Sequence, residues 1–193
     1  MRRSLLLIPL VLAIAVPLAV LLPQLWPARS AHLSAPAHAA LSGLLAGTRG
    51  STDVEVICAR LPQRPATDDE LRRMLADCRA SARMWLAMDR LEACASATCV
   101  RAQARQVADA AREAAAIEQR FADHLRGGCQ AFFEAQATYG DAVADAADAL
   151  TRVLADADLP AALDRWRRAL AAAERPFASD RVLALLDACD PDG

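Results

Sequence analysis

The chain has 193 residues and a net charge of −2, with 24 acidic residues against 22 basic ones, all of which are arginine. This balance gives no support to a nucleic-acid partner, which requires a basic surface. Alanine accounts for 47 residues, which favours helix but buries little apolar area per residue. We therefore expect a helical fold that needs additional stabilisation.

The first 26 residues are typical of a segment that enters a membrane. Arg2 and Arg3 precede an apolar run of 18 residues, Leu5 to Leu22, and Trp26 follows it. At about 1.5 Å per residue, a helix of this length extends about 27 Å, near the thickness of a bilayer core. The positive-inside rule keeps the arginines cytoplasmic and sends the remaining 165 or so residues across the membrane. Abundant arginine without lysine indicates a GC-rich bacterial genome, so we expect a single-pass signal anchor in the inner membrane, with the bulk of the chain in the periplasm.

A cleaved signal peptide, which would release the chain into the periplasm, is the alternative. Such peptides have an apolar region of about 7 to 15 residues and a small-x-small site soon after it. The candidate sites are Ala28–Ser30, where Arg29 stands beside the cut, and Ala37–Ala39, which lies well beyond the apolar run. The retained anchor is therefore preferred, and cleavage stays open.

Residues 27–50 are interpreted as a linker with a short helix over Ala37–Ala46, and residues 51–193 as one helical, disulfide-bonded domain. The sequence Thr67-Asp68-Asp69-Glu70 is a capping box, which predicts that the first long helix starts there and continues to about Cys94. Apolar residues at helical spacing predict its buried face, namely Leu71, Met74, Leu75, Cys78, Ala82, Trp85, Leu86 and Met88.

Further helices follow with short connections, which favours antiparallel packing in an all-α bundle. The second helix is expected to begin at Ser96 or Thr98 and to stop at Gly127-Gly128. The third begins at Cys129, has a possible kink at Gly140 and ends at Leu159-Pro160. Pro160 suits the first turn of a fourth helix, and a last one is predicted after Pro176 with Ser179 as its cap.

Six cysteines, all beyond the apolar run, agree with delivery to an oxidising compartment. Each disulfide contributes about 2 to 4 kcal/mol to stability. Cys94 and Cys99 lie at the predicted turn between the first two long helices, close enough in sequence to bond. The other expected pairs, among 15 possible connectivities, are Cys58 with Cys129 and Cys78 with Cys189.

The side chains do not predict an enzyme, a metal site or a cofactor site. His124 is the one histidine within the predicted bundle, and no nucleophile stands at a recognisable spacing from it. The cysteines also lack the paired C-x-x-C spacing of a zinc site.

Acidic residues are concentrated in the C-terminal third, where residues 130–193 contain 12 Asp and Glu against 6 Arg. Asp141, Asp145 and Asp148 fall on one face of the third predicted helix. Like charges at this spacing repel by a few tenths of a kcal/mol, which is typical of a solvated face or of a surface that meets a cationic partner. These three residues are the candidates for partner binding.

The segment Arg-Met-Trp-Leu-Ala-Met-Asp-Arg at residues 83–90, followed by Cys94, Cys99-Val100 and Arg105, resembles the C-terminal signature of the LprI-type lysozyme inhibitor family. The resemblance covers about residues 57–107. Members of this family are exported, small, helical and disulfide-bonded, and some are taken to inhibit lysozyme in the envelope. The resemblance implies a structural role for its signature residues, Trp85, Leu86, Asp89, Cys94, Cys99 and Arg105.

We expect a non-enzymatic envelope protein whose periplasmic helical domain binds another protein. The resemblance suggests a lysozyme-like muramidase as that partner, and lysozymes are usually basic. The alternative is a structural or assembly subunit of an envelope complex, in which the anchor and the long helices pair with helices of other subunits.

Overall fold

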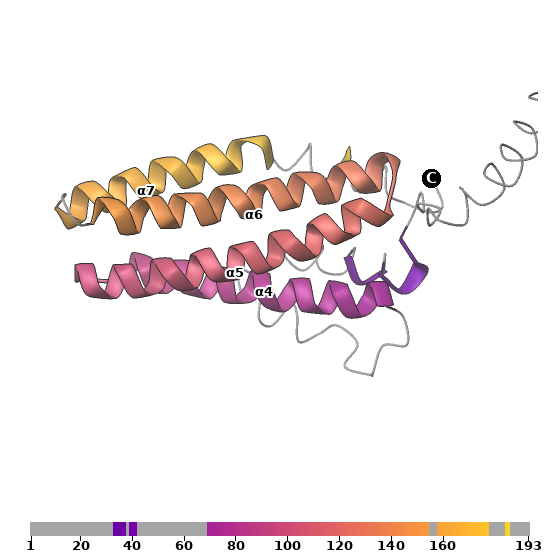
Figure 1. The fold of residues 1–193 in the computed structure, drawn as a ribbon, viewed down its shortest axis with the longest axis horizontal. Helices are drawn as coiled ribbons and strands as arrows, with labels where there is room; N and C mark the ends of the chain where they lie inside the picture. The colour runs from indigo at the N-terminus through magenta and orange to yellow at the C-terminus, as the bar shows by residue number, and fades with distance from the viewer. Residues whose placement is uncertain (1–32, 38, 42–68, 155–157, 178–183, 186–193) are drawn as a thin grey trace, which may run out of the picture.

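The computed structural model describes residues 33–37, 39–41, 69–154, 158–177 and 184–185, and this part of the chain is built from helices (Figure 1). The long helices are α4 (Asp69–Glu92), α5 (Ala97–His124), α6 (Gly127–Val153) and α7 (Leu159–Glu174), followed by the short 3-10 helix η1 (Arg175–Phe177). The all-α prediction is confirmed for these residues. Within the described ranges, no helix combines the length and apolar character that a membrane crossing requires. The anchor predicted over residues 1–26 lies outside them.

Consecutive helices lie side by side and run antiparallel. α5 packs along both α4 and α6, and α7 packs on α6 (Figure 1). α7 has 16 residues and α6 has 27, so at about 1.5 Å per residue α7 follows α6 for only about 24 Å of its length. Because α7 runs back from the C-terminal end of α6, it does not reach the N-terminal part of α6.

The turn between α4 and α5 is closed by a cap and a disulfide. The Ser96 hydroxyl accepts a hydrogen bond from the Cys99 amide at 3.2 Å, which satisfies one of the free N–H groups at the start of α5. Cys94 and Cys99 are joined by a disulfide, with their Cα atoms 5.6 Å apart. Of the two starts expected for this helix, Ser96 and Thr98, the structure shows the one at Ser96, and the expected Cys94–Cys99 pairing is confirmed.

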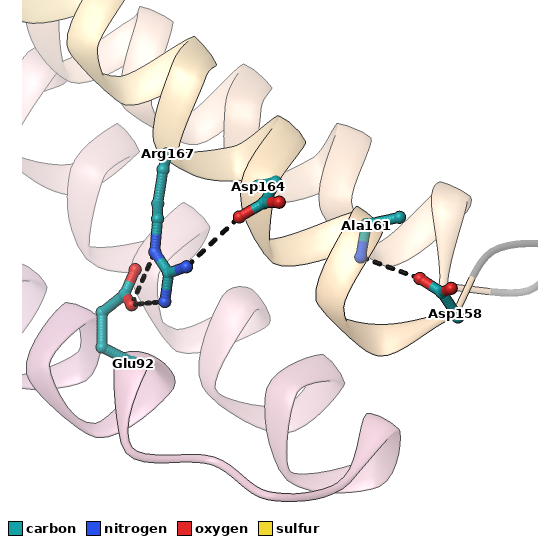
Figure 2. A network of polar contacts seen from close by, with 5 residues as sticks. All are labelled: Glu92, Asp158, Ala161, Asp164 and Arg167. Atoms are coloured by element: carbon teal, nitrogen blue, oxygen red, sulfur yellow. Dashed lines mark hydrogen bonds and ion pairs between the residues drawn. The ribbon is translucent and has the colours of Figure 1, made fainter.

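The next two turns show how α6 and α7 begin. Gly127 has a φ of 66°, a left-handed conformation that glycine adopts without a Cβ clash. α5 ends at His124, just before the stop predicted at Gly127-Gly128, and α6 begins at Gly127, two residues before the start predicted at Cys129. At the start of α7, the Asp158 carboxylate accepts a hydrogen bond from the Ala161 amide at 2.8 Å (Figure 2), and Pro160 occupies the first turn as predicted.

The core forms two clusters along the length of the bundle. One cluster joins the C-terminal half of α4, the N-terminal half of α5, the C-terminal half of α6 and α7, and Trp166 is 2% exposed within it. The other joins the opposite ends of α4, α5 and α6 with residues 33–41, and Phe121 and Phe133 stack there with ring centroids 4.6 Å apart. The bundle thus has a dense core at each end.

Polar contacts connect the outer elements to α4. Arg167 of α7 donates to one Glu92 oxygen at 2.6 and 3.1 Å and also lies 3.4 Å from Asp164 (Figure 2). At the other end of α4, the Ser34 amide donates to the Glu70 carboxylate at 2.6 Å. α7 and the segment 33–41 therefore cover opposite ends of α4.

The predicted buried face of the first helix is only partly correct. Leu71, Met74, Cys78, Ala82 and Met88 are buried, whereas Leu75 and Leu86 are half-buried and Trp85 is 37% exposed. The buried positions instead include Met84, Ala87 and Leu91. The face that contacts α5 is therefore rotated away from Trp85.

Cys78 and Cys129 are buried and each is disulfide-bonded. Their expected partners, Cys189 and Cys58, lie outside the described residues, so those two pairings stay predictions. The same holds for the start of the last predicted helix at Ser179.

Candidate functional site

The acidic face predicted on α6 is smaller than expected. Asp141 and Asp145 are exposed, and no ion pair among the described residues involves them. Asp148 is half-buried and forms an ion pair with Arg112 of α5. Because Arg112 offsets the charge of Asp148, only Asp141 and Asp145 present an uncompensated negative charge along this face.

A cavity of about 110 Å³ lies between the two core clusters, where α4, α5 and α6 meet. It is lined by Ser81, Met84, Trp85, Ala114, Glu118, Gln136, Tyr139 and Gly140. Gly140 brings α6 close to α5, since a Cβ at this position would lie 3.0 Å from the Ala111 carbonyl oxygen and 3.0 Å from the Ala115 Cβ. Gly140 therefore allows close packing of α6 on α5, and α6 continues through this position from Gly127 to Val153.

The position of the cavity follows from the length of α7. Glu174, the last residue of α7, acts electrostatically on Tyr139, so the end of α7 lies near the cavity. Burial, together with Glu174, raises the pKa of Tyr139 to about 12. The cavity thus adjoins the point where α7 stops covering α6.

Glu118 is the buried charged residue of the described core, with 7% of its surface exposed. Its Oε2 atom has no hydrogen-bond partner. Burial raises the pKa of Glu118 well above its ordinary value, and the nearby Asp77 and Asp141 raise it further. A buried acceptor without a donor is costly, so this carboxyl group is poised to accept a hydrogen bond from a ligand.

Asp77 of α4 is half-buried, with its Oδ1 atom out of contact with solvent. Burial raises its pKa from 3.8 to about 7, and its Oδ1 atom also has no hydrogen-bond partner. Glu118 therefore lies within electrostatic range of one acid on α4 and one on α6. Together Asp77, Glu118 and Asp141, which we call the acid triplet, bring three carboxyl groups from three helices to one level of the bundle.

Trp85 forms the outer rim of this site. It is the exposed large hydrophobic residue of the described chain, and it lines the same cavity as Glu118. No basic side chain lines the cavity within the described part of the chain. Among these residues, no group of three or more His, Cys, Asp or Glu side chains is arranged to hold a metal ion. The described lining of the site therefore has an aromatic side chain and hydrogen-bond acceptors but no basic side chain.

A second hollow, of about 370 Å³, lies between α4 and α5. Leu86 lines it, and Arg83 and Glu113 form an ion pair across it at 2.6 Å. Its charges of both signs compensate each other, in contrast with the acid triplet. Of the remaining signature residues, Asp89 and Arg105 are exposed, as is His124 at the end of α5.

Asp77 and Glu118 were not predicted from the sequence, although a spacing signal exists. Buried residues of α5 follow alternating steps of three and four, and Glu118 is the one charged member of the series Val100, Ala104, Val107, Ala111, Ala114, Glu118, Phe121 and Leu125. The same steps place Asp77 and Ser81 between Met74 and Met84 on α4. Polar residues within an otherwise apolar heptad pattern thus indicate where the cavity lies along the bundle.

Comparison of the chain with protein-family models, with curated proteins and with solved structures finds no match. The resemblance to the lysozyme inhibitor family therefore stays a prediction from the sequence.

Proposed function

We propose that this chain is a non-enzymatic protein-binding module of the bacterial envelope. Residues 1–26 hold it in the inner membrane, and the helical domain binds a basic protein in the periplasm. The observation that carries the proposal is the exposed Trp85 beside a cavity that has acidic groups and no basic side chain. Trp residues are enriched among the residues that dominate binding energy at protein interfaces.

Charge supports a cationic partner. Asp141 contributes to the acid triplet beside the cavity, and Asp145 continues the negative charge one turn further along α6. Exposed charges at the edge of an interface mainly steer the encounter and select the partner. A basic lysozyme is the first partner to test, because the sequence resemblance suggests a muramidase.

The test uses the full chain in mild detergent and measures its affinity for a basic lysozyme at low salt. Replacing both Asp141 and Asp145 by asparagine should weaken binding about fivefold, at about 0.5 kcal/mol per exposed charge. The difference should shrink at 0.5 M salt, where charges are screened beyond about 4 Å. The matched control is Asp89→Asn with Asp123→Asn, which removes the same charge from α4 and α5.

Equal affinity of the two double variants at low salt would remove the electrostatic basis of the proposal. Absence of lysozyme binding and inhibition, together with copurification of other membrane subunits, would favour the assembly-subunit alternative.

A further inference from the structure

We propose that the cavity under Trp85 is the receptor for a single arginine side chain of the protein partner. This inference rests on the proposed function and names the group that the partner inserts. It depends on the size of the cavity, on the unpartnered acceptor Glu118 and on the aromatic residue at its rim, which are independent observations.

Size excludes most small molecules. Pockets that bind metabolites or drug-sized ligands usually have volumes of about 300 to 1,000 Å³, and this cavity has about 110 Å³. Such a volume holds several water molecules or the end of one side chain. The cavity therefore suits a residue presented by another protein better than a free metabolite.

The acceptors select a cation with several donors. Glu118 Oε2 is buried, has no hydrogen-bond partner and belongs to a residue that lines the cavity. Asp77 is not among the residues that line the cavity, and it acts on Glu118 electrostatically. An arginine presents five N–H donors in a planar fork and stays charged, so its guanidinium can bind the Glu118 carboxyl group through two donors at once. Lysine offers a compact ammonium that lacks this planar fork.

Trp85 favours arginine for a second reason. A guanidinium stacks on the face of a tryptophan, and such cation–π contacts contribute about 0.5 to 2 kcal/mol depending on desolvation. Trp85 lines the cavity and remains 37% exposed, so its ring is accessible to a side chain that enters from outside. Glu118 is buried whereas Trp85 is exposed, so the Glu118 carboxyl group lies deeper than the aromatic ring.

Binding of a cation should release a proton to solvent. The groups that face Glu118 are Asp77 from α4 and Asp141 from α6, while Tyr139 lines the cavity and Glu174 of α7 acts on Tyr139. Burial makes Asp77 titrate at about 7, so this group is largely protonated at pH 6 and largely ionised at pH 8. Because Asp77 acts electrostatically on Glu118, its ionisation makes the cavity more negative, so affinity for arginine should be higher at pH 8 than at pH 6.

An alternative role for Asp77 and Glu118 is to fix the register of the helices, as buried polar residues do in coiled coils. In that case, the carboxyl groups would matter for stability and would not bind an added guanidinium. The experiment below separates the two accounts.

The probe is blocked arginine, N-acetyl-arginine amide, added to the full chain in detergent with ¹⁵N-labelled tryptophan. The chain has three tryptophans, and Trp85→Phe assigns the Trp85 indole signal. The inference predicts a saturable shift of this signal with an affinity on the order of millimolar, as expected for one side chain. Blocked citrulline, which has the same shape without the charge, should bind at least fivefold more weakly.

Glu118→Gln preserves the shape of the cavity but cannot ionise when a guanidinium binds, and it should weaken arginine binding about tenfold. Glu113→Gln is the matched control, because it makes the same change on α5 in the other hollow. Equal binding of blocked arginine and citrulline, or unchanged binding in Glu118→Gln, would overturn the inference.

If lysozyme binding depends on Asp141 and Asp145 but not on Glu118, the proposed function is retained and the arginine receptor is rejected. If blocked arginine binds and lysozyme does not, the receptor stands and that partner is wrong.

Discussion

Replacing Asp77 by asparagine should stabilise the protein at neutral and alkaline pH. The amide has nearly the shape of the carboxyl group but carries no charge to bury. Burial raises the pKa of Asp77 from 3.8 to about 7, so the folded protein binds more protons than the unfolded chain between these two values. The free energy of unfolding therefore falls as pH rises from about 4 to about 7 and is constant above that range, as far as this group is concerned.

The magnitude follows from the same two values. The interval from 3.8 to about 7 corresponds to about 4 kcal/mol, at about 1.36 kcal/mol per pKa unit. Asp77→Asn should thus have nearly wild-type stability at pH 4 and should be more stable by up to about 4 kcal/mol at pH 8.

The measurement is equilibrium urea unfolding, followed by circular dichroism, of the oxidised full chain at pH 4, 6 and 8. Asp89→Asn is the control, because Asp89 is exposed on the same helix and a surface change of this kind stays within about 0.5 kcal/mol. If Asp77→Asn is destabilised at pH 8, or if its difference from wild type does not grow with pH, the description of a buried, unsatisfied carboxyl group is wrong.

Four further variants test the packing and the disulfide. Gly140→Ala places a Cβ 3.0 Å from the Ala111 oxygen and the Ala115 Cβ, so the free energy of unfolding should fall by about 1 to 3 kcal/mol. Trp166→Ala should lower it by about 3 to 5 kcal/mol because Trp166 is buried, whereas Trp85→Ala should cost less than about 1 kcal/mol. Equal costs for the two tryptophans would contradict their placement. Replacing both Cys94 and Cys99 by alanine opens a short loop and should cost about 2 kcal/mol, measured in thermal or urea unfolding.

Local signals predicted the starts of α5 and α7 well, whereas α6, which was expected from Cys129 to Leu159-Pro160, extends from Gly127 to Val153. Ser96, Pro160 and the Cys94–Cys99 pair act through neighbours a few residues away, so the sequence contains nearly all the information that these features require. Helix starts and short-range disulfides depend mainly on residues that are close together in the sequence. Gly127 shows the limit, because a glycine after a helix and a glycine before the next one look alike in sequence.

The buried face of α4 was harder to predict because the chain is rich in alanine. Alanine occupies buried, half-buried and exposed positions on these helices, so it does not mark which face is apolar. The large apolar side chain of Trp85 therefore led to the wrong face being predicted as buried, because the face that packs on α5 contains Met84 and Leu91. Only the contact with α5 and α6 resolves the ambiguity.

The cavity depends on three helices at once and therefore could not be predicted from one helix alone. Glu118 interrupts an apolar series on α5, which indicates a buried charge but not its surroundings. Ser81, Gln136 and Gly140 meet Glu118 only after the helices have paired. The acidic face on α6 was predicted from spacing, but the ion pair between Asp148 and Arg112 also requires the fold.

Site-specific photo-crosslinking in living cells tests the central claim most directly. A photoreactive phenylalanine analogue replaces Trp85 in the full chain, and the same analogue at Arg105, an exposed residue of α5, is the control. The proposal predicts a discrete adduct with a basic protein from position 85, which is absent from position 105. The arginine receptor predicts in addition that Glu118→Gln weakens this adduct. No adduct from position 85, or the same adduct from both positions, would contradict it.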